Sequence, residues 1–177
     1  MRRLILALSF LAAVNTSYAQ KTWTPVSQDI SFKIKNAGLY VNGTFDGGRS
    51  TLLFSPDKLQ ASSLKETVEV GTLKTGIGLR DKHLKGELYF NEDSFKTIEV
   101  ASTKIYAKNA DYAGMFNVKI KGVTKEIEIP FEFNEFGDEA DIKGTFTINR
   151  KDFNVGGSSV TMSDEVEVSI HIKVRRS

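Results

Sequence analysis

The stretch EVEVSIHIKVR, Glu165 to Arg175, decides the fold of this chain. Apolar and polar residues alternate strictly along it, and a period of two places the two kinds of side chain on opposite faces of a β-strand. One face is therefore buried and the other meets water, as in an antiparallel sheet that is covered on one side. The apolar face consists of Val166, Val168, Ile170, Ile172 and Val174.

The same alternation recurs along most of the chain from Gln20 onward. About eight extended segments follow one another, separated by turn signals such as the stretch 134–138. Short links join antiparallel neighbours, and such a meander closes most naturally into a barrel, although alternation alone also fits two stacked sheets. Pro130 falls on the outward face of one strand and predicts a bulge or a local gap in the ladder. The sequence predicts an all-β fold, an eight-stranded antiparallel barrel.

One stretch departs from this pattern: GIGLRDKHLKGELYF, Gly76 to Phe90. Its apolar residues Ile77, Leu84 and Leu88 lie at spacings of seven and four, which is the period of a helix. A short helical crossing segment is therefore expected near residues 75–91. In a small barrel such a segment lies across one end or one side of the interior.

The N-terminus has the pattern of a secretory signal peptide. Two arginines precede an apolar run at residues 4–14, and small residues follow up to Ala19. The apolar run is well short of the roughly 20 residues that a membrane-spanning helix needs. We therefore predict a signal peptide over residues 1–19, cleaved after Ala19, and a single domain over residues 20–177 of a periplasmic or secreted protein.

Charge limits the kinds of partner. The chain has 24 basic and 22 acidic residues, and the two arginines of the predicted signal account for the whole excess, so the mature chain has no net charge. The basic surface that binds nucleic acid is absent from this composition. The chain also contains no cysteine, which excludes disulfides and thiolate chemistry. We expect no nucleic-acid partner.

The crossing segment carries the densest cluster of polar side chains. Arg80, Asp81 and His83 lie within four positions, and the i, i+3 spacing brings Arg80 and His83 together on a helix. Arg80 could then offer a fixed cation to a polar ligand head group, with His83 beside it. Alternatively, the cluster is a solvated helical face.

Signatures of catalysis are missing. No nucleophile motif frames any serine, and Gly76 and Gly78 do not complete a dinucleotide fingerprint. His83 and His171 are far apart in the sequence, and no cysteine accompanies them, so no zinc ligand set is evident. The sequence predicts no catalytic residue, no cofactor and no metal.

Glu66 is the one carboxylate that alternation places inward, since Leu64 and Val68 flank it at two-residue spacing. A buried carboxylate needs a hydrogen-bond partner, water or a counter-charge. It could meet a ligand or an arginine such as Arg150. We favour the alternative, a register shift or bulge that turns Glu66 outward.

Several longer stretches resemble the YceI-like family of bacterial periplasmic proteins, in particular the versions found in Bacteroidetes-type bacteria. The quoted stretches are ISFKIKNAGLYVNGTFDG, TLLFSPDKLQASSL, VGTLKTGIGLRDKHLKGELYF, IKGVTKEIEIPFEF and GTFTINRKDFNVGG. Thr75 to Leu84 matches the family pattern T-G…R-D-x-H-L, and Asn149 to Phe153 matches N-R-x-D-F ahead of a glycine-rich loop. Asn36 stands where the family often has a histidine.

The resemblance implies an extended lipocalin-like barrel whose elongated interior binds a polyisoprenoid or a similar long-chain amphiphile. Isoprenoid quinones, polyprenyl phosphates and fatty acyl chains are the ligands it suggests, for transport or storage and not for catalysis. The crossing-segment positions carried over from the family are Arg80, His83 and Leu84. Alternation adds the expected lining positions Phe32, Phe45, Phe54, Phe116 and Phe146.

Other readings stay open at this point. A barrel of this size can be packed solid, which would suit a ligand-free envelope or stress-response module. A hydrolase using Arg80, Asp81 and His83 would need a titratable pair within hydrogen-bond reach. A homodimer is a further expectation.

Overall fold

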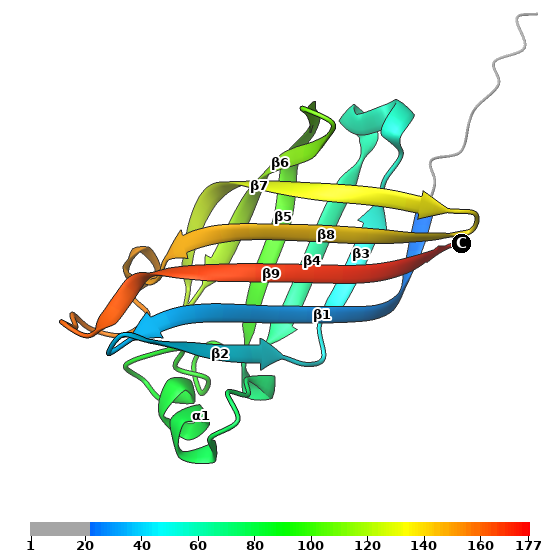
Figure 1. Ribbon diagram of the computed structural model, residues 1–177. Helices are drawn as coiled ribbons and strands as arrows, with labels where there is room; N and C mark the ends of the chain where they lie inside the picture. Colours follow the sequence, from blue (N-terminus) through cyan, green and yellow to red (C-terminus); the bar gives the residue numbers. More distant parts are fainter. Residues whose placement is uncertain (1–21) are drawn as a thin grey trace, which may run out of the picture.

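The computed structural model describes residues 22–177 of the chain. The predicted signal peptide lies outside these residues. Nine strands make up most of the fold (Figure 1): β1 (Thr22–Asn36), β2 (Leu39–Phe45), β3 (Arg49–Leu53), β4 (Ser63–Glu69), β5 (Thr97–Lys108), β6 (Asp111–Ile120), β7 (Val123–Phe136), β8 (Glu139–Asn149) and β9 (Met162–Arg176). One α-helix, α1 (Gly78–Lys85), and three short 3-10 helices, η1 (Pro56–Ala61), η2 (Val70–Thr72) and η3 (Arg150–Phe153), connect them.

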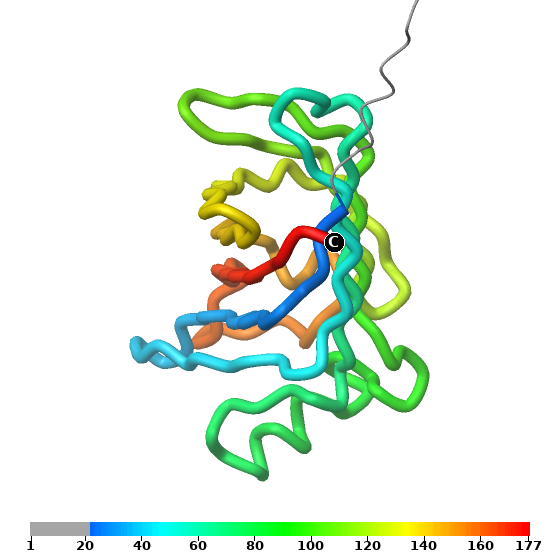
Figure 2. Tube along the Cα trace, turned by 90° about the vertical axis from the view of Figure 1, so that its right-hand side faces the viewer, coloured from blue at the N-terminus to red at the C-terminus, as the bar shows by residue number. Residues whose placement is uncertain are grey.

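The strands form one antiparallel sheet that closes on itself. The order runs β2-β1-β3-β4-β5-β6-β7-β8-β9, and β1 also pairs with β9. The result is a closed eight-stranded, lipocalin-like barrel with β2 as an extra strand, which confirms the predicted fold and excludes two separate sheets. β1 closes the barrel, because it pairs with β9 on one edge and with β3, at Thr22 and Trp23, on the other. From Ile30 onward this second edge of β1 pairs with β2 instead. Figure 2 shows the blue and cyan part of the chain, in which β2 turns back beside β1 before the chain continues into β3.

The alternating stretch Glu165 to Arg175 forms most of β9, as predicted. Ile172 and Val174 are buried and the intervening Lys173 is exposed, so the period of two holds. β9 pairs with β1 on one side and β8 on the other along almost its full length. It is therefore a central strand of the closed wall.

The β7–β8 ladder is short. It runs only from Glu132–Lys143 to Phe136–Glu139, next to the hairpin that joins the strands. Pro130 lies just before the point where this pairing begins, and a proline has no N–H to donate. The predicted local gap in the ladder at Pro130 is confirmed.

Large aromatic side chains fill the half of the barrel where β1 begins. Trp23 and Phe54 are almost fully buried, and their rings contact Phe133 with centroid distances of 5.3 and 4.5 Å. The indole Nε1 of Trp23 donates a 2.9 Å hydrogen bond to the carbonyl oxygen of Phe54. We call this half the packed end.

The opposite half carries α1 and a smaller hydrophobic cluster. Ile30, Phe45, Val68 and Leu73 form this cluster, with Leu84 of α1 packed against it. The helix is shorter than the sequence pattern suggested, since Ile77 and Leu88 lie outside it and are more than half exposed. We call this half the open end.

Candidate ligand cavity

A cavity of about 250 Å³ lies inside the open end. Its wall is mostly aliphatic and aromatic, with side chains from β1, β2, β4, β5, β6, β8, β9, α1 and the segments after α1 and η3. The apolar lining consists of Ile30, Phe32, Ile34, Val41, Phe45, Val68, Leu84, Phe90, Ile98, Val100, Val118, Ile120, Phe146, Ile148, Phe153, Val155, Met162, Val166, Val168 and Ile170. Ser31, Asn36, Glu66, Arg80, His83, Tyr89 and Arg150 complete it.

Most of the site residues expected from the sequence lie around this cavity. The three positions on the crossing segment do so, because α1 lies against the open end. Three of the five phenylalanines chosen by alternation line it as well. The six lining residues are Phe32, Phe45, Arg80, His83, Leu84 and Phe146.

Phe54 and Phe116 do not line the cavity, which corrects the expectation. Phe54 is fully buried among the rings of Phe131, Phe133 and Tyr112 at the packed end. Phe116 is 5% exposed and belongs to the same packed core. Alternation identifies the inward face of a strand, but it does not tell how far along the barrel an inward side chain lies.

Three phenylalanine rings form one continuous wall of the cavity. Phe45 contacts Phe32 and Phe90, with ring centroids 5.7 and 5.9 Å apart. The Phe32 ring lies directly over Gly43 of β2, so closely that a Cβ at residue 43 would clash with it. Glycine at this position therefore leaves room for the tip of the Phe32 ring.

Thr75 and Asp81 fix the start of α1. The Asp81 carboxylate accepts hydrogen bonds from the Thr75 backbone N–H, at 2.8 Å, and from its hydroxyl. Arg80 donates from Nε to the Thr75 hydroxyl and from Nη2 to the Thr75 carbonyl, both at 2.7 Å. The T-G…R-D part of the motif is therefore a helix-positioning device as well as part of the cavity wall.

His83 lies on the neighbouring turn and packs its ring against Tyr89, with centroids 4.9 Å apart. His83 is exposed while it also lines the cavity, so it is a residue of the cavity entrance. Within residues 22–177, Nη1 of Arg80 makes no hydrogen bond. Arg80 and His83 thus place one available donor group and one imidazole beside an otherwise apolar space.

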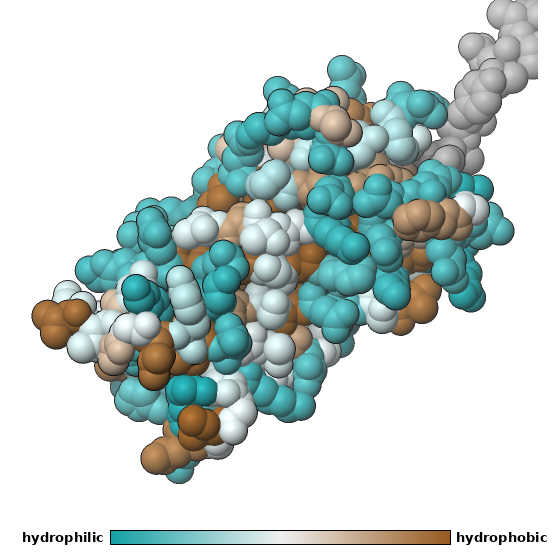
Figure 3. Space-filling view, in the orientation of Figure 1, coloured by the Kyte–Doolittle hydropathy of each residue, from teal (hydrophilic) through white to brown (hydrophobic). Residues whose placement is uncertain are grey.

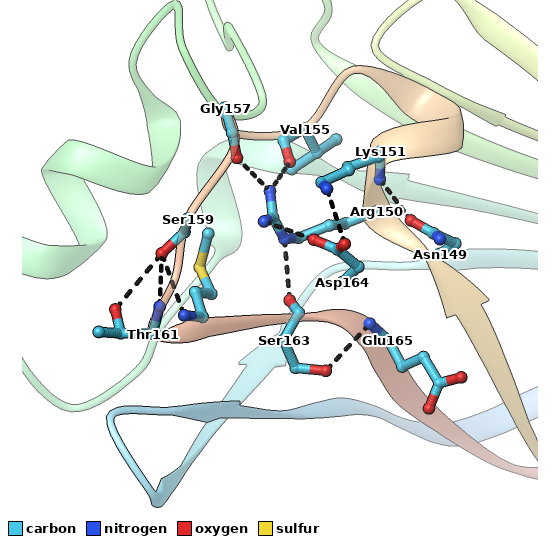
Figure 4. Close-up of polar contacts among 11 residues, drawn as sticks. Asn149, Arg150, Lys151, Val155, Gly157, Ser159, Thr161, Ser163, Asp164 and Glu165 are labelled. Atoms are coloured by element: carbon cyan, nitrogen blue, oxygen red, sulfur yellow. Dashed lines mark hydrogen bonds and ion pairs between the residues drawn. The ribbon is translucent and has the colours of Figure 1, made fainter.

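Arg150 is a cavity residue that sequence reasoning did not select. Its side chain is 4% exposed, and it holds the segment between η3 and β9 (Figure 4). Nε donates to the Ser163 carbonyl at 2.9 Å, Nη1 donates to the Val155 and Gly157 carbonyls at 3.0 and 2.9 Å, and Nη2 donates to Asp164 at 2.8 Å. The N-R-x-D-F motif contains Arg150, but the motif does not predict which carbonyl groups and carboxylate its side chain binds.

The carboxylate partner of Arg150 is shared. Asp164 also forms an ion pair with Lys151 at 2.7 Å. The hydrogen bond from Lys151, with the charges of both basic groups, lowers the pKa of Asp164. Asp164 therefore stays ionised beside the buried guanidinium of Arg150.

Glu66 is buried and lines the cavity, so the favoured expectation of an outward turn was wrong. The ladder is regular here, with Glu66 opposite Ser50 on β3 and Val100 on β5. Its partner is the Ser50 hydroxyl and not Arg150. Burial raises the pKa of Glu66. The hydrogen bonds from Ser50 and from nearby backbone amides lower this pKa, but by less than burial raises it.

The two oxygens of the Glu66 carboxyl have different surroundings. The Ser50 hydroxyl donates to Oε2 of Glu66 and also lies 2.8 Å from Oε1 of Gln28, although it has one proton to donate. Oε1 of Glu66 is buried and has no hydrogen-bond partner within residues 22–177. Burial of this kind disfavours the charged form of a carboxyl, which is the main cause of the raised pKa of Glu66.

Among residues 22–177, no group of three or more His, Asp or Glu side chains could hold a metal ion. In the same range, no helix is long and apolar enough to cross a membrane.

A closed eight-stranded barrel around one apolar cavity defines the class of lipocalin-like proteins. A YceI-like domain model matches residues 22–174 of this chain. The chain belongs to the YceI-like family.

Two bacterial relatives illustrate the match. A UPF0312 protein of Pseudomonas aeruginosa is 28% identical over 153 residues, and one of Pectobacterium atrosepticum is 26% identical over 151 residues. Both alignments cover 81% of this chain and 79% of the relative.

Solved structures share the fold. BcnA of Burkholderia cenocepacia aligns with a TM-score of 0.80 at 21% identity, covering 82% of this chain and 95% of BcnA. The YCEI protein of Campylobacter jejuni gives a TM-score of 0.71 at 20% identity, covering 77% and 85%. A polyisoprenoid binding domain from Saccharophagus degradans gives 0.68 at 10% identity, covering 89% and 99%.

Proposed function

We propose that this protein is an exported binding protein that holds a polyisoprenoid or another long-chain amphiphile in its cavity for transport or storage. The candidates are isoprenoid quinones, polyprenyl phosphates and fatty acyl chains. The observation that carries the proposal is the composition of the cavity wall, in which 20 of 27 lining residues are Val, Ile, Leu, Phe or Met. Such a wall offers little to a polar ligand and much to a hydrocarbon chain.

The energetics suit a chain ligand. Each buried methylene contributes roughly 0.8 kcal/mol, so about ten of them supply about 8 kcal/mol. A free energy of that size corresponds to a micromolar dissociation constant, from which the costs of association are still to be subtracted. Hydrocarbon burial therefore supplies the driving force for binding, and a chain longer than about ten methylenes offsets the costs of association.

Arg80 and His83 are the proposed head-group contacts. Both lie on α1 at the cavity wall, and Arg80 keeps one nitrogen free of hydrogen bonds within residues 22–177. A phosphate or carboxylate at this position would gain a charge-assisted hydrogen bond from the guanidinium. Leu84, one position beyond His83, supplies the adjoining apolar contact.

Two further observations support the proposal. The relative from Saccharophagus degradans is described as a polyisoprenoid binding domain. The sequence of residues 1–19 has the composition of a signal peptide, which supports export to the periplasm or beyond.

We propose binding and not hydrolysis. The carboxylate of Asp81 is engaged with Thr75, and the neighbour of the His83 ring is Tyr89, so these residues do not form an acid–base pair with each other. The cavity also argues against a barrel that is packed solid for a ligand-free role.

A fluorescent polyene fatty acid tests the proposal by titration, followed by displacement with a prenol, a quinone or a prenyl phosphate. Val168→Trp places a large side chain in the cavity and fills part of it. Lys173→Trp, on the outward face of the same strand, is the matched control. We expect saturable binding that Val168→Trp abolishes and Lys173→Trp leaves unchanged, with both variants folded by circular dichroism. Equal binding by both variants would place the probe outside the cavity and contradict the proposal.

A further inference from the structure

We propose that the open end of the barrel docks on the surface of a lipid bilayer, with three uncharged segments in contact with the lipid. The inference rests on the proposed function, because a carrier of long-chain amphiphiles must exchange its ligand with a membrane or another carrier. It adds the partner and the surface that would make this exchange possible.

The first observation is where exposed apolar side chains gather. Leu39 and Tyr40 of β2 are 74 and 65% exposed, Leu79 of α1 is 81% exposed, and Val160 in the loop before β9 is fully exposed. All four belong to segments at the open end, and Figure 3 shows apolar surface at that end of the molecule. We call these four side chains the rim.

Hydrogen bonds hold the three segments of the rim together. The backbone N–H of Ala37, in the β1–β2 turn, donates to the Thr161 carbonyl at 2.9 Å. Thr44 of β2 and Lys74, ahead of α1, exchange two backbone hydrogen bonds of 2.8 and 3.0 Å. The rim is therefore a fixed part of the fold, continuous with cavity residues such as Val41.

The second observation is charge. Segments 36–45, 75–79 and 153–163 contain no Asp, Glu, Lys or Arg, although 26% of the chain is charged. The β7–β8 turn at the packed end, in contrast, carries charged residues that pair with the end of β9. A segment that enters the head-group and acyl boundary of a bilayer must avoid charge, because burying a charge there is costly.

Two lysines lie close in sequence to the rim residues. Lys35 lies just before the β1–β2 turn and Lys82 on α1; both are exposed, and neither forms an ion pair within residues 22–177. Apolar side chains with nearby lysines match the pattern of proteins that lie on anionic membrane surfaces. Lys35 and Lys82 are therefore assigned to lipid head groups.

A bilayer fits this surface better than a folded partner does. The rim side chains project from three separate segments and not from one flat face. A fluid lipid surface adapts to separate projections and also brings hydrocarbon to a cavity whose wall is itself apolar. A rigid protein surface would need three matching pockets to bury the same residues.

Vesicle flotation of the mature protein tests the inference. The rim variant is Leu39→Ser/Leu79→Ser/Val160→Ser, and the control is Val26→Ser/Phe136→Ser, which removes exposed apolar side chains of other segments. On phosphatidylcholine vesicles containing phosphatidylglycerol we expect about ten-fold or greater loss of binding for the rim variant, as follows from burial of apolar side chains. The control should stay within about two-fold of the parent protein, since its residues lie off the rim.

A second pair of variants separates the charge effect. Lys35→Glu/Lys82→Glu should weaken binding to vesicles with phosphatidylglycerol but not to phosphatidylcholine alone. Equal losses for rim and control variants, or no vesicle binding by the parent protein, would overturn the inference. So would a parent dimer that the rim variant converts to a monomer in light scattering, since the rim would then be a contact between protein copies.

Failure of the docking inference and of the proposed function can be told apart. The polyene titration is carried out on the rim variant without vesicles. Retained probe binding with lost flotation supports docking, whereas lost probe binding in the parent protein contradicts the carrier function whatever the vesicles show.

Discussion

The two ends of this barrel are built from one alternating pattern, yet the apolar cavity lies at the open end and aromatic rings fill the packed end. At the packed end, inward positions carry Trp23, Phe54 and Phe133, whose rings meet across the interior. At the open end, β6 and β9 supply Val118, Val166, Val168 and other β-branched residues. The difference lies in the placement of the rings and not in the pattern. At the packed end the rings meet across the interior, whereas at the open end the rings of Phe32, Phe45 and Phe90 gather along one wall and valines and isoleucines line much of the rest.

The largest effect should come from removing a ring at the packed end. Phe54→Ala is expected to lower the free energy of unfolding by about 3–5 kcal/mol, because it opens a hole in a filled core. Phe146→Ala, on the half-buried wall of the cavity, should cost less than about 2 kcal/mol, because its ring already borders empty space. Urea unfolding compares the two variants. Equal costs would remove the distinction between the two ends.

Arg150 provides the next largest effect. Arg150→Met is expected to destabilise the fold by about 3 kcal/mol, because three carbonyl groups and Asp164 lose a buried charged partner. The control is Arg175→Met, which breaks the exposed ion pair with Glu139 and should change stability little. Urea unfolding and proteolysis of segment 154–161 measure the outcome. Similar stability of the two variants would show that Arg150 does not hold this wall of the open end.

Glu66 predicts a pH dependence of stability. Its pKa is raised by burial, so the folded protein holds this proton more tightly than the unfolded chain does. The stabilisation is fully present below the ordinary glutamate pKa of 4.5 and is lost as the pH rises through the higher pKa of the folded state. Glu66→Gln should remove this loss, so the stability difference between the two proteins should shift toward the variant as pH rises.

The difference in stability between the parent protein and Glu66→Gln isolates the contribution of Glu66. Asp164 and Glu128 have lowered pKa values and act in the opposite sense, but they are the same in both proteins. Urea unfolding at a series of pH values from 4.5 upward gives the difference. A difference that does not change with pH would mean that Glu66 is ionised in the fold.

The smallest expected effect concerns the head group. His83→Ala should weaken binding of a prenyl phosphate by about five-fold, the value of one lost hydrogen bond, and leave binding of the matching prenol unchanged. Arg80→Ala should weaken binding of the phosphate more than binding of the prenol; some loss of prenol binding is expected because Arg80 also holds Thr75 at the start of α1. Lys85→Ala, on the same helix but outside the cavity wall, is the control. Competition against the fluorescent polyene measures all three. Equal losses for phosphate and prenol would indicate damage to the open end as a whole.

The strands of the barrel wall could be predicted from the sequence, but which inward side chains fill the interior and which line a cavity could not. Strict alternation in β9 predicted which side chains point inward, and Pro130 predicted where the ladder is interrupted. Depth along the barrel depends on register between distant strands, which alternation does not encode. Phe54 and Phe146 therefore looked equivalent in the sequence, although one fills the packed end and the other lines the cavity.

Polar residues of the site were harder to predict for a related reason. Glu66 follows the period of its strand, but its burial requires a polar partner. That partner is Ser50, which also contacts Gln28, and both come from other strands. Arg150 was visible as part of a motif, while its partners lie 5 to 14 residues further on, in the loop after η3 and at the start of β9. Arg80 and His83 were found because both lie on one short helix, where spacing alone determines neighbourhood.

Native mass spectrometry of the exported protein, purified without detergent, tests most directly the claim that the open end holds a long-chain amphiphile. The account predicts a bound prenyl or acyl lipid in about equimolar amount, released on denaturation, identified in the organic extract, and absent from Val168→Trp. Protein that is consistently empty, and that stays empty after incubation with prenols, quinones, prenyl phosphates and fatty acids, would contradict it.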